Sequence, residues 1–467
     1  MRLTRRLGAV DGSALIISNV VGVGIFTAPG LVASMVSGPI QFLGVWTAGG
    51  LLALIGGLVY AELGGAYPEA GGEYVYLREA FGPGVAFLSG WTSLLAGFTG
   101  AIAAGAVGFA IHLERLIPEL ADTAPLRLGA VLTLDLDPRR LVALTLIALL
   151  ALVHARGLGP GRALQNALAG LSVLTIAALV AIGLTASAGR AAALPPWPAQ
   201  RAAEGGPILA LVLVMFTYSG WNAAAYLAGE MRTPGRSLHA AVVGGTLLVT
   251  ALYLGLNLLY LRTVPLGTLE GSVAVADVAA HAVLGRLGGG AVALVVGFAL
   301  ASGVSAMLLA GPRIYYAMAR DGVIPAAFGR VDPASGVPSF GVAAQALWAG
   351  VLVLTGAFES LLTYTAFAVV LFSATAVAAL FVLRRRPGYG HRPCVRAPGH
   401  PWVTSLFLLA SAAMLVQAVR FAPGPSLAGA SLIAAGIPAY LWTCRRASRQ
   451  RDAAPPKPEA PKAGGAP

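Results

Sequence analysis

Long apolar stretches recur along the whole chain, separated by short segments rich in Gly, Pro, Arg or acidic residues. A helix needs about 20 apolar residues to cross the hydrocarbon core of a bilayer. Within lipid, every backbone N–H and C=O group must be paired inside the protein, so membrane-spanning segments of this length are helical. The stretches therefore predict an all-α integral membrane protein.

About twelve such stretches can be distinguished, and they predict about twelve transmembrane helices. Their approximate ranges are 10–37, 41–66, 84–112, 140–156, 163–188, 207–229, 238–262, 289–318, 340–357, 360–383, 402–420 and 426–444. Only 11% of the 467 residues are charged, against about 25% in an average soluble protein, which agrees with a lipid environment. We expect residues 1–9 to precede a transmembrane domain of residues 10–444, and the polar residues 445–467 to form a disordered tail.

The distribution of basic residues predicts the orientation of these helices. The net charge of +12 falls in short bursts between apolar stretches, such as Arg384–Arg386, so no nucleic-acid partner is expected. With both termini on one side, that side carries about 22 of the 31 Lys and Arg residues and the other about 9. By the positive-inside rule, both termini are predicted to be cytoplasmic, in a multi-pass protein of the plasma (inner) membrane.

Two of the stretches carry glycines at their centres. The first reads Asn19-Val20-Val21-Gly22-Val23-Gly24-Ile25-Phe26, and the sixth reads Phe216-Thr217-Tyr218-Ser219-Gly220-Trp221-Asn222. The two lie about 196 residues apart, and the second and seventh stretches are separated by a similar offset. We interpret the chain as two halves of five helices, about 10–188 and 207–383, followed by two extra helices at 402–444.

A half with an odd number of helices places the next half upside down in the membrane. Broken helices at corresponding positions of such an inverted repeat mark the substrate site of many transporters. Single glycines also let membrane helices pack closely, and this reading stays open for either break taken alone.

The first break, Gly22-Val23-Gly24-Ile25-Phe26, resembles the Gly-Ser-Gly-Ile-Phe break in the amino acid–polyamine–organocation (APC) family. The nearest branch is that of the L-type amino acid transporters and their bacterial relatives. Residues 61–84, 216–237 and 313–325 resemble the family's loop after the second helix, its sixth helix and the end of its eighth. The resemblance implies a LeuT-like fold with discontinuous helices one and six, and amino acid transport by alternating access.

The break residues suit a zwitterion, because unwound helices offer free N–H and C=O groups that replace the water around its two charges. The resemblance implies that Gly22, Val23 and Gly24, with Ile25 completing the motif, face the substrate carboxylate, and that carbonyls around Val20, Phe216, Thr217 and Ser219 receive the ammonium. It also implies that Phe216 is a gating aromatic; the alternative is an ordinary lipid- or core-facing side chain.

The driving force is predicted from the fifth helix, where many family members carry a lysine. Alignment puts Ser172 at that position, and no lysine precedes Lys457, so a lysine-relayed proton symporter is not expected. Ser172, Ser302 and Ser305, with carbonyls near Val20 and Val23, could instead hold a monovalent ion, as in a sodium-coupled symporter. Alternatively, these hydroxyls pack helices and bond to carbonyls of their own helix. We favour exchange of one amino acid for another, which needs no ion.

The central parts of spans one, three, six, eight and ten contain no ionisable residue, so we expect neutral substrates; a cationic amino acid or polyamine carrier is the alternative. The sequence has no metal-ligand spacing and no nucleophile–base motif, so no metal, cofactor or enzymatic activity is expected. The loops predicted to lie outside contain no cysteine, and no disulfide-linked ancillary subunit is expected.

Three acidic residues outside these central parts also have predicted roles. Asp11, before the first span, is predicted to cap its helix. Glu62 and Glu230 lie near cytoplasmic helix ends, and either pair with arginines in an inner gate or face water. The candidate arginines are Arg78, Arg232, Arg236 and Arg320.

Overall fold

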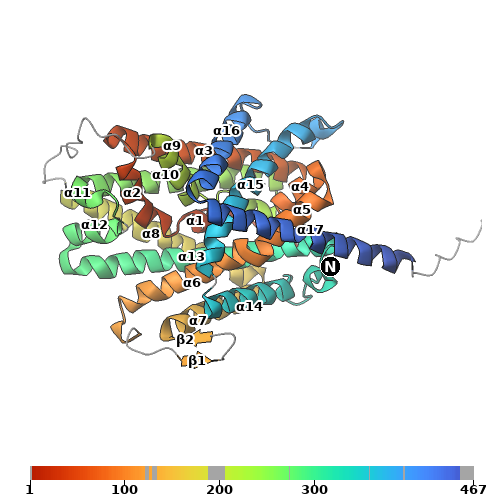
Figure 1. Ribbon diagram of the computed structural model, residues 1–467, viewed down its shortest axis with the longest axis horizontal. Helices are drawn as coiled ribbons and strands as arrows, with labels where there is room; N and C mark the ends of the chain where they lie inside the picture. The colour runs from red at the N-terminus through yellow and green to blue at the C-terminus, as the bar shows by residue number, and fades with distance from the viewer. Residues whose placement is uncertain are drawn as a thin grey trace, which may run out of the picture.

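The computed structural model describes residues 3–120, 126–128, 134–187, 206–272, 274–356, 358–392 and 395–452. These residues are mostly helical, and the long helices run roughly along the longest dimension of the molecule (Figure 1). The first half contains α1 (Ala9–Val20), α2 (Gly24–Ser34), α3 (Pro39–Ala66), α4 (Glu73–Phe81), α5 (Pro83–Thr92), η1 (Ser93–Gly97), α6 (Phe98–Glu114), η2 (Pro118–Leu120), α7 (Pro138–Ala155) and α8 (Leu158–Ser187).

The second half contains α9 (Gly206–Thr217), η3 (Ala223–Glu230), α10 (Pro234–Thr263), α11 (Leu266–Leu269), α12 (Val275–Leu284), η4 (Gly285–Leu287), α13 (Gly288–Arg320), η5 (Ala326–Gly329), α14 (Ser339–Thr355) and α15 (Phe358–Arg384). After it come η6 (Tyr389–His391), α16 (Trp402–Phe421) and α17 (Pro423–Asp452). A small antiparallel hairpin, β1 (Leu126–Leu128) and β2 (Leu134–Leu136), pairs Leu126 with Leu136 and Leu128 with Leu134. The sequence did not predict this hairpin.

The helices are those of a multi-pass membrane protein. Among the described residues, nine helices are long and apolar enough to cross a membrane, or ten if the bent pair α1 and α2 counts as one span. Two shorter apolar helices, α9 and α14, occupy the regions of the predicted sixth and ninth spans. The helix α9 is short because the chain leaves the helical conformation after Thr217.

Local sequence signals explain where several helices begin. Proline is the first residue of α3, α5, α7 and α10, where its missing N–H would have no helical partner in any case. At the start of α1, the backbone N–H of Gly8 donates to Asp11 Oδ2 at 2.8 Å. Asp11 therefore bonds to the start of its helix, but as the third residue of α1 and not, as predicted, from a position before the helix.

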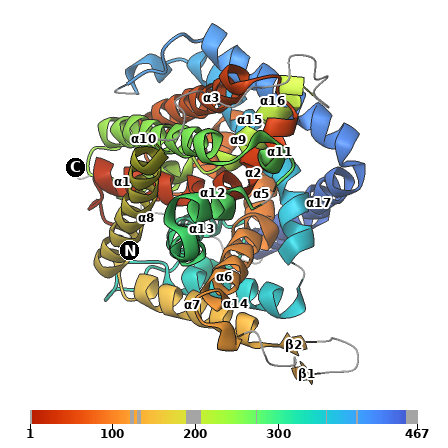
Figure 2. The same ribbon diagram turned by 90° about the vertical axis from the view of Figure 1, so that its left-hand side faces the viewer.

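Small residues let the central helices pack closely. A Cβ atom on Gly57 of α3 would lie 2.5 Å from Val242 Cγ1 of α10, too close for any side chain to fit. The central region also contains α1, which contacts both α10 and α13. In the span over Val275–Arg320, 78% of an 18-residue apolar stretch is buried inside the protein, whereas in α17 only 11% of such a stretch is buried. The core thus lies around α1, α10 and α13, and α17 lies at the edge, as the end-on view shows (Figure 2).

The end of the chain differs from its prediction. The helix α17 continues to Asp452, beyond residue 445, where we expected the disordered tail to begin. Arg, Ala and Gln dominate this extension and are among the better helix formers, so the helix propagates past its apolar part. Residues 453–467, which include the rest of that tail, and Cys394 lie outside the described residues.

Two ion pairs with buried carboxylates form near the end of the bundle that carries the N-terminus. Arg313 Nε on α13 donates to Glu230 Oε1 at 2.7 Å, and both side chains are at most 1% exposed. Glu62, on α3, pairs with Arg384 of α15, whose Nε donates to Oε1 at 2.9 Å. Glu62 and Glu230 are therefore paired, but with other arginines than those proposed from the sequence.

The peptide carbonyl of Glu230 holds the chain that precedes α1. The backbone N–H groups of Arg6 and Leu7 both donate to it, at 2.8 and 2.9 Å, and Arg232 N–H donates to the carbonyl of Leu7 at 2.9 Å. One residue thus connects the N-terminal segment, the end of η3 and, through Arg313, α13.

We expect Arg313→Ala to lower the free energy of unfolding by about 3–5 kcal/mol, because it leaves the Glu230 carboxylate buried without a partner. Arg115→Ala is the control, since Arg115 forms a partly exposed pair with Asp277 and should contribute about 0–1 kcal/mol. Denaturant unfolding in mixed micelles measures both. Equal, small changes in the two variants would contradict a structural role for the Arg313–Glu230 pair.

Candidate substrate site

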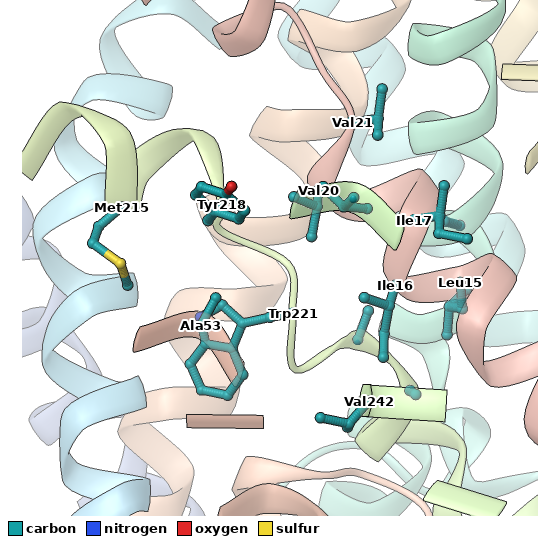
Figure 3. Close-up of a cluster of buried hydrophobic side chains, with 14 of the residues drawn as sticks. Leu15, Ile16, Ile17, Val20, Val21, Ala53, Met215, Tyr218, Trp221 and Val242 are labelled. Atoms are coloured by element: carbon teal, nitrogen blue, oxygen red, sulfur yellow. The ribbon is translucent and has the colours of Figure 1, made fainter. Parts of the chain in front are cut away.

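Two helices are interrupted near the middle of the bundle. The helix α1 ends at Val20 and α2 begins at Gly24, with a bend of 53° between their axes. In the sixth predicted span, α9 ends at Thr217, and a 3-10 helix, η3, begins only at Ala223. Figure 3 shows the two interruptions together, with Val20 at the end of α1 and Tyr218 and Trp221 in the segment after α9. Both interruptions fall within the two glycine-containing motifs.

Glycines allow the two interrupted segments to touch. A Cβ atom on Gly24 would lie 2.8 Å from Thr217 Cγ2. Gly220 has a φ of +109°, and a Cβ there would lie 2.7 Å from the carbonyl carbon and oxygen of Asn19. Both the conformation and the contact at Gly220 therefore require glycine.

A single tyrosine hydroxyl joins the two helix ends. Tyr253 Oη, from α10, lies 2.8 Å from the carbonyl oxygen of Val20 and 3.1 Å from that of Thr217, and can donate to either. These are the last residues of α1 and α9, where carbonyls lack helical partners. Tyr253 was not singled out from the sequence, which assigned both carbonyls to the substrate ammonium and the carbonyl near Val20 also to a possible ion site.

A cavity of about 230 Å³ lies at the interruptions. Most of the predicted binding residues line it, together with small residues of α6 and apolar residues of α13. The predicted residues in its wall are Val20, Gly22, Val23, Gly24, Phe216, Thr217 and Ser219. Ile25, predicted alongside them, is fully buried in the hydrophobic core and is not part of this wall.

A second cavity of about 170 Å³ shares Asn19, Phe216 and Ser219 with the first and extends it. One turn of π-helix, η1, interrupts the helix between α5 and α6 and ends at Gly97 in the wall of this cavity. Such turns occur frequently at functional sites. Phe216 lines both cavities and is 49% exposed, a position compatible with a gate.

The second cavity also contains a carboxyl group that sequence reasoning overlooked. Glu73, the first residue of α4, lines this cavity and is only 6% exposed. Its sequence position, between the second and third spans, suggested a loop away from the site. The central parts of the five spans named above do not include Glu73, so counting charges within them missed a carboxyl that reaches the cavity from a connecting helix.

The three serines proposed as an ion site have separate partners. Ser172 Oγ donates to the carbonyl of Leu168, one turn back on its own helix, at 2.9 Å. Ser302 Oγ lies 2.6 Å from Ser18 Oγ, and Ser305 Oγ lies 2.9 Å from His154 Nε2. Ser172 thus follows the alternative reading, in which a hydroxyl bonds back to its own helix.

A polar side chain of α8 joins this region to α1. Gln165 Nε2 donates to Ser18 Oγ at 2.6 Å, so that Gln165, Ser18 and Ser302 form one buried network across α8, α1 and α13. Neither Ser18 nor Gln165 was singled out from the sequence, because their partners lie more than a hundred residues away.

Comparison with known proteins agrees with this architecture. The profile of the amino acid permease family matches residues 7–443. The chain belongs to this family of amino acid transporters, within the APC group that its motifs resemble. It is 26% identical to the serine/threonine exchanger SteT of Bacillus subtilis over 450 residues, which cover 95% of this chain and 98% of SteT.

Two further relatives are similar over most of their length. Human b(0,+)-type amino acid transporter 1 is 28% identical over 393 residues, covering 82% of this permease and 76% of the human protein. The branched-chain amino acid permease BcaP of Lactococcus lactis is 28% identical over 398 residues, covering 81% of this permease and 82% of BcaP.

We expect Tyr253→Phe to lower the free energy of unfolding by about 1–3 kcal/mol, because the carbonyls of Val20 and Thr217 lose a buried donor. Tyr260→Phe is a matched control, since Tyr260 is fully buried two turns further along α10 and its hydroxyl has no hydrogen-bond partner among the described residues. Thermal unfolding in detergent compares the two. The same shift in both variants would show that the shared hydroxyl does not stabilise the interruptions.

Proposed function

We propose that this permease is a secondary carrier of neutral amino acids that works by alternating access and exchanges one amino acid for another. The observation that carries the proposal is that two interrupted helices line one cavity with their peptide groups. Peptide dipoles can replace the hydration of both charges of a zwitterion without a buried charged side chain.

The two ends of the interruptions offer opposite partial charges. The N-terminus of α2 begins at Gly24, and its N–H groups, with those of Gly22 and Val23, suit a carboxylate. The C-terminal ends of α1 and α9 offer carbonyls to an ammonium. Because Tyr253 already contacts the carbonyls of Val20 and Thr217, we assign more of the ammonium binding to the segment of Phe216 and Ser219.

The helix contacts support a LeuT-like inverted repeat with about twelve spans. In this arrangement, α3 corresponds to α10, and α6 corresponds to α13; both corresponding pairs are in extensive contact. We further propose that both termini are cytoplasmic and that the protein works in the inner membrane without a disulfide-linked subunit. The distribution of Arg and Lys and the positions of the two cysteines support this assignment.

We prefer exchange over sodium coupling. The relative SteT is named as an exchanger, and the hydroxyls of Ser172, Ser302 and Ser305 bond to three different partners. An ion site built from them would require these hydroxyls to turn toward a common point near the carbonyls of Val20 and Val23.

One observation favours a second candidate substrate class. Glu73 lines the cavity that extends from the interruptions, and a carboxylate there could accept a cationic side chain. A cationic amino acid carrier is therefore the alternative to a carrier of neutral substrates.

Uptake by proteoliposomes tests the proposed function. We expect labelled neutral amino acids to enter faster when the vesicles contain unlabelled substrate, and sodium or proton gradients of either direction not to drive accumulation. Accumulation driven by a sodium gradient without internal substrate would refute exchange. Linear, non-saturable flux would refute a carrier.

Phe216→Ala tests the proposed gate. We expect the apparent affinity for the transported amino acid to fall by about tenfold, equivalent to about 1.4 kcal/mol, because the aromatic cover over the cavity is lost. Phe421→Ala removes an exposed phenylalanine at the end of α16 and should leave the affinity unchanged. Unchanged affinity in Phe216→Ala would mean that Phe216 does not cover the substrate.

A further inference from the structure

The Glu73 carboxyl is buried beside the cavity, and its hydrogen-bond partners in the described part of the chain are two hydroxyl groups. Ser89 Oγ of α5 donates to Glu73 Oε1 at 2.9 Å, and Tyr60 Oη of α3 donates to Oε2 at 3.0 Å. Among the described residues, no Arg, Lys or His forms an ion pair with it. An isolated carboxylate is costly away from water, so this group needs a proton, a cation or solvent.

The charged groups on the elements packed around α4 are engaged elsewhere or face water. Three tyrosines interact with Glu73, namely Tyr60, Tyr76 and Tyr226. Tyrosine is uncharged at physiological pH because its ordinary pKa is about 10. The helix α5 carries no charged residue, and Arg320 of α13 is exposed. Among the side chains that the structure describes, the remaining charged groups form the pairs Glu62–Arg384, Glu230–Arg313, Arg78–Glu69, Arg78–Glu79 and Arg78–Asp321.

The surroundings favour the protonated carboxyl. Burial raises the pKa of Glu73, and the hydrogen bonds from Ser89 and Tyr60, which favour the ionised form, offset part of this rise. Most of the cavity wall beyond the carboxyl is apolar, including Phe98, Met215 and Met307.

The carboxyl is also connected to the interrupted sixth span. The ring of Tyr60, which donates to Glu73, packs edge-to-face on Trp221 with ring centres 5.0 Å apart. Asn222 Nδ2, the next residue, donates to Tyr226 Oη at 3.3 Å. Trp221 and Asn222 belong to the segment between α9 and η3, so Tyr60 connects Glu73 to the segment that lines both cavities.

We infer that Glu73 is a proton-binding site of this carrier, and that a neutral amino acid occupies the cavity only when this carboxyl is protonated. Occlusion of a neutral substrate excludes the water that would otherwise solvate the carboxylate, so binding takes a proton from solvent onto a Glu73 oxygen. No other bond changes. The inference rests on the proposed function, because it needs a neutral amino acid as the ligand.

Substrate affinity measured against pH tests this inference. The dissociation constants of L-alanine, L-serine and L-leucine, from calorimetry on the purified full chain, should rise with pH, approaching tenfold per unit above the pKa of the carboxyl. In weakly buffered solution, a pH-sensitive dye should report proton uptake on binding. Glu73→Gln, which mimics the neutral carboxyl, should bind with affinity independent of pH and without proton uptake.

Two further variants sharpen the test. Tyr60→Phe removes a hydroxyl that favours the ionised form, so the pH dependence should move to higher pH while Glu73 stays in place. This variant decides the matter if Glu73→Gln does not fold. Glu79→Gln is the matched control on α4; Glu79 pairs with Arg78 outside the cavity and its loss should leave the pH profile unchanged.

The following results would overturn the inference. One is a wild-type affinity for neutral amino acids that is independent of pH, and another is a Glu73→Gln variant that keeps the wild-type pH profile. A third is an affinity for L-lysine that falls more than tenfold in Glu73→Gln while the affinity for neutral amino acids does not depend on pH. That result would mean that the Glu73 carboxylate binds the cationic side chain of a substrate instead of a proton. If no amino acid binds the wild type at any pH, the proposed function fails rather than this inference alone.

Discussion

The structure depends on which hydrogen-bond donors the peptide carbonyls find where two helices end inside the bundle. Ending α1 at Val20 and α9 at Thr217 leaves carbonyls without helical partners inside a bundle of apolar helices, whose side chains offer few hydrogen-bond donors. The hydroxyl of Tyr253 lies within hydrogen-bond distance of both carbonyls. A hydroxyl carries one hydrogen, so Tyr253 donates to only one of the two carbonyls at a time. The close contact of Gly220 with Asn19 keeps the two interruptions together and makes their shared donor possible.

Hydropathy and glycine placement predicted much of the fold, because both are local. Apolar length marks the spans, and the glycines in Gly22-Val23-Gly24 and at Gly220 mark interruptions that the structure contains. Local sequence could not predict the partners. Tyr253 is one of several tyrosines in an apolar helix, and Val20 lies 233 residues away from it. Arg313 likewise reaches Glu230 over 83 residues, past arginines closer in sequence.

Glu73 was missed for a different reason. Hydropathy assigns its segment to a connection between spans, and this is correct for α4 as a whole. The fold nevertheless turns the first residue of that helix inward, onto Tyr60, Ser89 and the wall of the second cavity. Counting charges within spans therefore underestimates the charge near a site whenever a connecting helix folds back against the bundle. The inference of neutral substrates then depends on the protonation state of one carboxyl.

Glu230 combines two attachments at the end of η3. Its carboxylate holds α13 through Arg313, and its peptide oxygen holds Arg6 and Leu7 of the segment before α1. Three parts of the chain are thus bound to one residue, and a partial release would leave a buried charge or buried N–H groups without partners. Passage to a conformation open at this end should consequently be concerted, with half-detached forms too high in energy to accumulate.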